Sequence, residues 1–279
     1  MQLFKDARYF QILFQSIFLS YGIFYLHWQN ELWLYATYFT ISLFTFFICA
    51  FIFDDKKIPL YTTIKNGIPS VLISSFGLSL LLKTNHWESA VFAASISIVS
   101  KYVLRVNGKH IFNPSALGIV ATIFICNDCW ISPGQWGSGF ILLFAVSCFG
   151  FIVLTRVQKL TVSTTFLGIF ISLLFIRQII YLGWPLDYFL QSISTGSLLL
   201  FSFFMITDPK TLPNNVVVRN LWIIAVACIA FYYSTFKFVN GAPIFVLVFA
   251  QLFVPLLDKL FTGKKFEWEY QKITTTTFS

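Results

Sequence analysis

Ten long apolar segments, separated by short polar connections, decide what this chain can fold into. Charged residues make up only 11% of the 279 residues, against about 25% in soluble domains. A soluble fold could not cover its surface with so few charges, which excludes a cytosolic enzyme, a secreted domain and a disordered protein. A membrane-spanning helix needs about 20 residues, so ten spans would occupy most of the chain. The segments are residues 9–26, 32–53, 68–82, 90–100, 111–126, 138–154, 162–176, 193–206, 221–234 and 244–257.

The positions of the basic residues predict how these spans are oriented. If the N-terminus is cytoplasmic, all but three of the 19 Lys and Arg residues fall on the inner side, the exceptions being Lys83, Arg177 and Lys237. Cytoplasmic loops of membrane proteins carry such an excess of basic residues. We therefore expect a multi-pass protein of a bacterial-type inner or cell membrane, with both termini in the cytoplasm. This excess of basic residues on the cytoplasmic side accounts for the net charge of +8. Nucleic acid is therefore not expected as a partner.

Similar short stretches recur in the two halves of the sequence. Residues 68–77 and 192–198 both begin an apolar segment and are rich in small hydroxyl residues. Val106-Asn107-Gly108 and Val239-Asn240-Gly241 each precede a later segment. Small residues are also common wherever helices pack closely in membranes, which is the alternative interpretation.

If the recurrence is a repeat, each span of the first half corresponds to the span five places later. Because five is odd, the two halves cross the membrane in opposite directions. Inverted repeats with short or broken helices are typical of proteins that hold a ligand near the bilayer midplane. We therefore predict an all-α fold of about ten spans, built as two inverted five-helix repeats with broken helices. Repeat 1 covers about 9–126, repeat 2 about 138–257, and a cytoplasmic tail follows at 258–279, all within one membrane domain, 1–279.

The first polar motif lies at the start of the fifth predicted span and reads Asn107-Gly-Lys109-His110-Ile-Phe-Asn113-Pro114-Ser115. Asn113 is suited to cap a helix, Pro114 to occupy its first turn, and Ser115 to leave backbone donors free near the helix start. A helix N-terminus attracts anionic groups, and Lys109 and His110 add positive charge. We predict ligand binding by Lys109, Asn113, Pro114 and Ser115; the alternative is an ordinary capped span with basic anchors.

The second polar motif follows the eighth predicted span and contains Thr207-Asp208-Pro209-Lys210-Thr211. Proline turns the chain here because it moves the preceding residue away from helical angles. Acidic residues at membrane depth tend to be functional, although Asp208 beside Lys210 could also be simply solvated. Because the orientation places both motifs on the cytoplasmic side, they can form one site at the ends of spans five and eight.

These motifs, together with Ser194-Thr195-Gly196-Ser197 and residues 241–258, resemble the NqrB/RnfD family. Its members are membrane subunits of the sodium-pumping quinone reductase and of the Rnf electron-transport complex. The resemblance extends from about residue 65 to 260 and implies a fold like that of urea transporters, with ten spans in an inverted repeat. It also implies a non-covalent flavin (riboflavin or FMN) and redox partner subunits in the lipid bilayer. The site residues it adds are Thr195, Gly196, Ser197, Thr207, Asp208, Pro209 and Thr211.

The chain departs from that family in one loop. Family members attach an FMN to a threonine in an outward loop between the fifth and sixth spans, whereas residues 127–137 are short and contain no threonine. We therefore expect no covalent FMN, and the chain more closely resembles the short branch labelled enediyne biosynthesis protein UnbU. We predict a subunit of an ion-translocating oxidoreductase rather than an enzyme by itself, with no catalytic residue assigned. The alternatives are a transporter or channel for a small solute with the same fold, and an assembly subunit without a ligand.

The same loop contains two cysteines three residues apart. Cys126 and Cys129 could form a redox pair or supply half of a metal site. The sequence does not indicate the other ligands that a complete metal site would need. No metal site is therefore predicted. His27, His86 and His110 do not pair on one span, so haem ligation is not expected.

Overall fold

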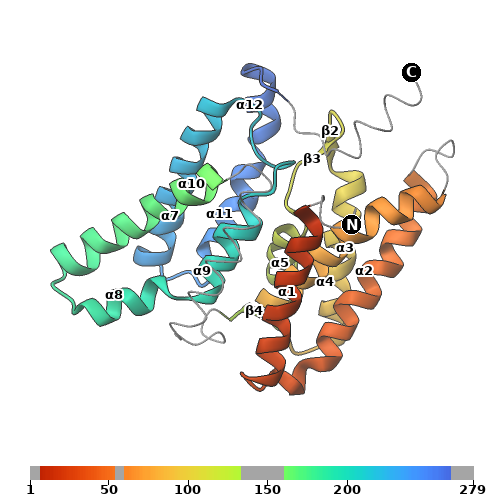
Figure 1. Cartoon of the computed structure of the whole chain (residues 1–279), viewed down its shortest axis with the longest axis horizontal. Coiled ribbons are helices and arrows are strands. Elements are labelled where there is room, and N and C mark those ends of the chain that lie inside the picture. The colour runs from red at the N-terminus through yellow and green to blue at the C-terminus, as the bar shows by residue number, and fades with distance from the viewer. Residues whose placement is uncertain (1–6, 54–59, 133–159, 265–279) are drawn as a thin grey trace.

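The computed structural model describes residues 7–53, 60–132 and 160–264, and these residues are mostly helical. The first half of the chain forms α-helices linked by short strands (Figure 1). Its elements are α1 (Ala7–Phe24), the 3₁₀ turn η2 (Trp28–Glu31), α2 (Leu32–Phe53), α3 (Leu60–Leu81), β1 (Leu82–Thr84), α4 (Trp87–Val103), β2 (Arg105–Val106), β3 (Lys109–His110), α5 (Pro114–Ile125) and β4 (Cys129–Ile131).

The second half is helical throughout its described residues, and two of its helices continue as π-helical turns. Its elements are α7 (Leu160–Phe175) with η4 (Ile176–Tyr181), α8 (Leu186–Ile193), α9 (Gly196–Leu200) with η5 (Phe201–Met205), α10 (Val216–Phe236), α11 (Ala242–Gln251) and α12 (Val254–Leu260). Every predicted span overlaps one or more of these helices except that at 138–154, which lies outside the described residues.

Four helices among the described residues are long and apolar enough to cross a membrane. They are Leu32–Phe53, Tyr61–Leu81, Leu160–Tyr181 and Val216–Phe236. Two bent pairs, α8 with α9–η5 at 46° and α11 with α12 at 43°, raise that number to as many as six if each pair is one span. The prediction of a helical membrane protein with several spans is confirmed at this level, and the number ten stays a prediction.

Helix α3 begins earlier than the sequence predicted. The apolar segment was expected to start at residue 68, but the helix starts at Leu60 and contains Pro69 in its interior. Proline removes a backbone donor and weakens the hydrogen bonds around it. Two cations from neighbouring helices donate to carbonyls on either side of Pro69: Arg8 Nη1 to the Asn66 oxygen at 2.8 Å, and Lys101 Nζ to the Ser70 oxygen at 2.7 Å. These contacts stabilise a continuous helix where a short one was expected.

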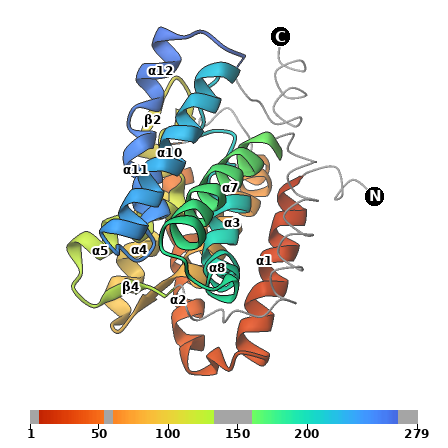
Figure 2. The ribbon, with the colours of Figure 1, turned by 90° about the vertical axis from the view of Figure 1, so that its left-hand side faces the viewer.

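Two small sheets mark the opposite ends of the molecule. Strands β2 and β3 pair antiparallel beside α12 at one end, and β1 pairs antiparallel with β4 at the other (Figures 1 and 2). We call these the hairpin end and the β1–β4 end. Helix α5 connects them, because it begins after β3 and ends before β4.

Helices α5 and α11, one from each half, lie antiparallel to each other. The backbone N–H of Asn113, at the start of α5, donates to Gln251 Oε1, at the end of α11, at 2.9 Å. At the other end, Gly241 precedes α11 and its Cα faces Ile131, which follows α5. Gly108 and Gly241, the last residues of the two Val-Asn-Gly stretches, both have positive φ, 74° and 70°.

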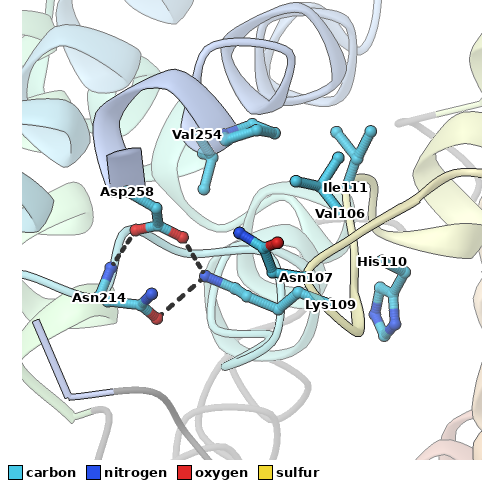
Figure 3. A pocket seen from close by; sticks show the side chains of 9 residues that line it. Val106, Asn107, Lys109, His110, Ile111, Asn214, Val254 and Asp258 are labelled. Carbon is cyan, nitrogen blue, oxygen red and sulfur yellow. Dashed lines mark hydrogen bonds and ion pairs between the residues drawn. The ribbon is translucent and has the colours of Figure 1, made fainter. Parts of the chain in front are cut away.

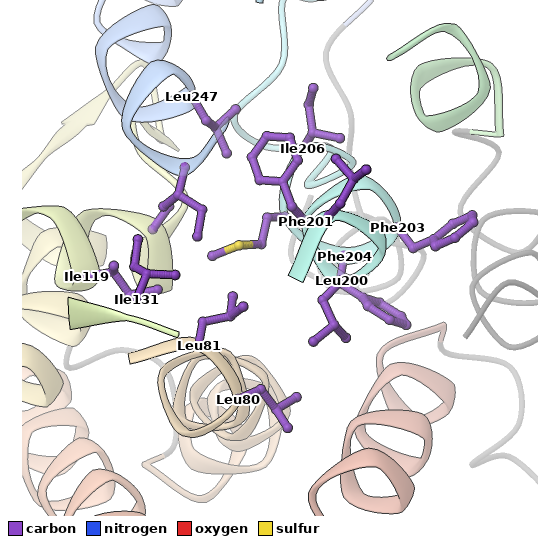
Figure 4. Close-up of a cluster of buried hydrophobic side chains, with 14 of the residues drawn as sticks. Leu80, Leu81, Ile119, Ile131, Leu200, Phe201, Phe203, Phe204, Ile206 and Leu247 are labelled. Atoms are coloured by element: carbon purple, nitrogen blue, oxygen red, sulfur yellow. The ribbon is translucent and has the colours of Figure 1, made fainter. Parts of the chain in front are cut away.

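The apolar core lies between the two halves, and α9–η5 passes through it (Figure 4). Phe201 and Phe204 are almost completely buried. The Phe201 ring lies 5.1 Å from that of Phe166 in α7, and the Phe204 ring lies 6.5 Å from that of Phe18 in α1. Since the second polar motif directly follows η5, this packing fixes the motif relative to both halves.

Close packing of α4 against α5 predicts a strong effect of substitution at Gly118. A Cβ atom there would lie 2.9 Å from the Ala93 carbonyl oxygen and 3.0 Å from Ser97 Cβ. Forcing extra atoms into a packed core costs about 1–3 kcal/mol, so Gly118→Val should lower the melting temperature of the purified protein in detergent. Gly168→Val is the matched control, because nothing lies within 4 Å of a Cβ atom at Gly168 in α7. Equal melting temperatures of the two variants would contradict this packing.

Candidate functional site

The two polar motifs meet at the hairpin end. His110 lies on β3, and its Nε2 is 3.4 Å from Asp208 Oδ2 in the loop after η5. Asp208 Oδ1 also accepts a hydrogen bond from the backbone N–H of Lys210 at 3.1 Å. The structure therefore brings the motifs together as the predicted orientation requires, and the contact joins the two halves of the chain.

Lys109 makes a second connection between the halves (Figure 3). Its Nζ donates to the Leu212 carbonyl oxygen at 2.6 Å, to Asn214 Oδ1 at 3.1 Å and to Asp258 Oδ2 at 2.8 Å. Asp258 Oδ1 accepts from the backbone N–H of Asn214 at 2.7 Å. Because Lys109 is only 9% exposed, its charge depends on these oxygens rather than on water.

Burial and mutual contact set the ionisation of His110 and Asp208. Burial lowers the pKa of His110 below its ordinary value, although Asp208 opposes this shift. Burial alone would raise the pKa of Asp208, but the hydrogen bond and charge of His110 and the backbone N–H of Lys210 outweigh it and lower that pKa. Each member of the pair thus acts on the pKa of the other, Asp208 opposing the shift of His110 and His110 contributing to the shift of Asp208.

Further basic residues surround this pair. Lys101, at the end of α4, is 7% exposed and donates to the backbone oxygen and to Oγ of Ser70. Arg105 donates to the Lys101 carbonyl oxygen and pairs with His110 in the β2–β3 ladder. The charges of Lys101 and Lys210 act on His110. Burial lowers the pKa of Lys101 to about 7, so Arg105 and Lys210 are the basic residues near Asp208 that keep their full charge at neutral pH.

Asn113 caps the start of α5, as predicted. Asn113 Oδ1 accepts from the Ala116 backbone N–H at 3.2 Å and from Ser115 Oγ at 2.9 Å, and Pro114 occupies the first helical position as predicted. Asn113 Nδ2 donates to the Met205 carbonyl oxygen at 3.3 Å. Asn113 and Ser115 are each 6% exposed. The Asn113 amide therefore links α5 to η5, and ligand binding by Asn113, Pro114 and Ser115 stays a prediction.

The threonines of the second motif shape its turn. Thr207 Oγ1 donates to the Phe203 carbonyl oxygen at 2.7 Å, and Thr211 Oγ1 donates to the Asp208 carbonyl oxygen at 3.2 Å. The π-helical turn η5 directly precedes them, with the Ile206 N–H bonded to the Phe201 oxygen at 3.1 Å. Single π-helical turns are frequent at functional sites. Thr211 thus fixes the turn that starts at Asp208, and Thr207 is bonded to the end of η5 just before it.

The structure does not bring Thr195, Gly196 and Ser197 to this site. They lie at the start of α9, and the helical residues 196–205 separate them from the second motif by roughly 15 Å. Their grouping with Asp208 came from the family resemblance alone. The bend of 46° between α8 and α9 falls next to them.

A small cavity opens beside Lys109 and His110, and its lining includes residues that the sequence did not indicate. Its volume is about 210 Å³. Asp258 could have been found by the signal that identified Asp208, an acidic residue at the end of an apolar run. No sequence signal distinguished Asn214. The lining residues are Val106, Asn107, Lys109, His110, Ile111, Asn214, Val254, Pro255 and Asp258.

No family model and no curated protein matches this chain. The apolar helices define its class, a helical protein that crosses the membrane several times. The site at its hairpin end is a partly buried pocket between the two halves, lined by the Lys109–Asp258 ion pair, His110 and two asparagines.

Proposed function

We propose that this chain is a membrane subunit of the NqrB/RnfD type that binds a flavin, or a similar ring with an anionic end, non-covalently. It acts with redox partner subunits in the bilayer. The observation that supports this proposal is the meeting of the two motifs on which the resemblance rests, through His110 and Asp208.

The pocket suits one end of such a ligand. Pockets that enclose whole drug-sized ligands measure about 300–1,000 Å³, so a volume of about 210 Å³ accommodates a phosphate and part of its chain rather than a tricyclic ring. Asn107 and Asn214 place side-chain amides in its lining, and Lys109 and His110 could turn donors toward a phosphate by releasing Asp258 and Asp208. Entry of the ring requires α12 and the loop at 206–215 to move apart.

The topology that we propose with this function has ten spans in an inverted repeat, with the hairpin end in the cytoplasm. The antiparallel pair α5 and α11 supports the repeat, as does the positive φ that Gly108 and Gly241 share at the ends of the two Val-Asn-Gly stretches. The basic residues that gather at the hairpin end support its cytoplasmic location.

The absorption spectrum of the purified protein, with its intact mass, tests the proposal. We expect flavin absorption bands together with an intact mass that equals the bare chain after denaturation. A colourless preparation that also binds neither riboflavin nor FMN when these are added would contradict flavin binding. An added FMN mass would contradict the non-covalent attachment.

A transporter for a small solute is a second candidate, favoured by one observation. Helices α11 and α12 form a bent pair, and Gln251 at the break is completely buried. Its Nε2 has no hydrogen-bond partner among the described residues. Unsatisfied polar groups at helix breaks are typical of transporter binding sites. Solute flux into liposomes that contain a colourless protein would favour this function, and loss of that flux in Gln251→Leu would assign the site.

A further inference from the structure

A group of metal-ligating side chains lies at the β1–β4 end, away from the site described above. Cys126 and Cys129 each offer a sulfur atom and Asp128 offers a carboxylate oxygen, and these ligand atoms all lie within 4.8 Å of one another. Helix α5 separates them from the hairpin end by roughly 18 Å, given its 12 residues.

The backbone around these three residues is held by hydrogen bonds. The Cys126 N–H donates to the Thr122 carbonyl oxygen at 2.7 Å, which ends α5. Cys129 is paired with Thr84 in the β1–β4 ladder. The cysteines are therefore positioned by two different elements, and their proximity does not depend on one flexible loop.

Asp128 is fixed by contacts to the start of α4. Its Oδ2 accepts from the His86 backbone N–H at 3.0 Å, and its Oδ1 accepts from Ser89 Oγ at 2.7 Å. Cys129 Sγ donates to the same Oδ1 at 3.4 Å. The Cys129 sulfur and the Asp128 oxygen therefore face each other across one thiol proton. A metal ion bound between these two atoms would take the place of that proton.

We propose that Cys126, Asp128 and Cys129 form a binding site for a thiophilic divalent cation of the zinc class. Two cysteine sulfurs and one carboxylate oxygen are ligands that Zn²⁺ accepts, and three protein ligands leave a fourth position for water or another group. Binding displaces one proton from each thiol, so that M²⁺ exchanges for two protons and no electron is transferred. Because Asp128 also contacts α4, the ion links α5, β4 and α4.

Cobalt and zinc binding to the full-length protein in detergent test this site. We expect reduced, metal-free protein to bind one Co²⁺ with thiolate-to-cobalt absorption, and Zn²⁺ to displace it. Cys126→Ser and Cys129→Ser should each weaken Zn²⁺ binding by at least about tenfold in competition with a chromogenic chelator. Asp128→Asn should weaken it as well, while its remaining oxygen can still accept a hydrogen bond from the start of α4.

Cys228→Ser is the matched control, because Cys228 is a free, exposed cysteine on α10 outside the cluster. It should leave the Co²⁺ spectrum and the Zn²⁺ affinity unchanged. Absence of thiolate-to-cobalt absorption in the wild-type protein would overturn the proposal. A stable disulfide that forms in the presence of Zn²⁺, seen as an intact mass lower by two hydrogens and absent in Cys126→Ser, would overturn it too.

Discussion

Lys109→Met is expected to destabilise the protein by about 3–5 kcal/mol, the cost of removing one partner from a buried ion pair. The Lys109 and Asp258 side chains are 11% and 15% exposed and 2.8 Å apart. Removal of the ammonium leaves the Asp258 carboxylate buried without its cation, and Leu212 and Asn214 lose a donor. These residues belong to β3, the loop at 206–215 and α12, so the hairpin end should loosen as a unit.

Thermal melting of the purified variant in mild detergent measures this effect. Lys259→Met is the matched control, because Lys259 neighbours Asp258 on α12 but is exposed. Addition of Asp258→Asn to Lys109→Met should recover part of the loss, since the uncompensated charge is then absent. A melting temperature for Lys109→Met that equals that of Lys259→Met would contradict the ion pair.

Asp208→Ala should weaken FMN binding by about tenfold or more, while the protein stays inserted in the membrane. A hydrogen bond to a charged group contributes about 1.5–3 kcal/mol, and Asp208 holds both the His110 ring and the Lys210 backbone N–H. Without these contacts His110, which lines the pocket, is no longer oriented. Removal of a negative charge alone would favour an anionic ligand, so Asp208→Asn, which keeps an acceptor, should retain most of the affinity.

Quenching of FMN fluorescence by the purified protein gives the affinities for this comparison. Membrane yield and the size-exclusion profile of each variant report whether it has inserted and folded. An unchanged FMN affinity in Asp208→Ala would exclude Asp208 from the site. Equal losses in Asp208→Ala and Asp208→Asn would instead show that an uncharged acceptor at this position does not hold His110 in place.

The sequence predicted the helices well because a helix that is buried in a membrane requires a long apolar run, which can be recognised locally. Asn113 and Pro114 begin α5 as predicted, since the preferences of a cap and of proline are local. The early start of α3 could not be predicted. It depends on Arg8 and Lys101, cations that donate to carbonyls near Pro69 from distant parts of the chain.

The candidate site was predicted only in part, for the same reason. Lys109 and Asp208 stood out because they are charged residues in short motifs at the ends of apolar runs. Their partners Asn214 and Asp258 lie 105 and 149 residues from Lys109, so no local pattern connects them. Asn113 was predicted from its local pattern, but its contact with Met205, which joins the halves, could not be.

The central claim is that the two halves bring position 110 and position 208 together at one end of the molecule. Cross-linking of engineered cysteines tests it most directly. The background is a chain with serine in place of its native cysteines, Cys49, Cys126, Cys129, Cys148 and Cys228. Into this background His110→Cys is introduced with either Asp208→Cys or Thr195→Cys, and the membranes are treated with a short bifunctional thiol reagent.

Intact mass then counts the reagent molecules on each chain. For the pair at 110 and 208 we predict one reagent that bridges both thiols. For the pair at 110 and 195 we predict two separate reagents, because the helical residues 196–205 hold those positions apart. Bridging of 110 to 195, or two separate reagents on the pair at 110 and 208, would contradict the arrangement from which the proposed site is built.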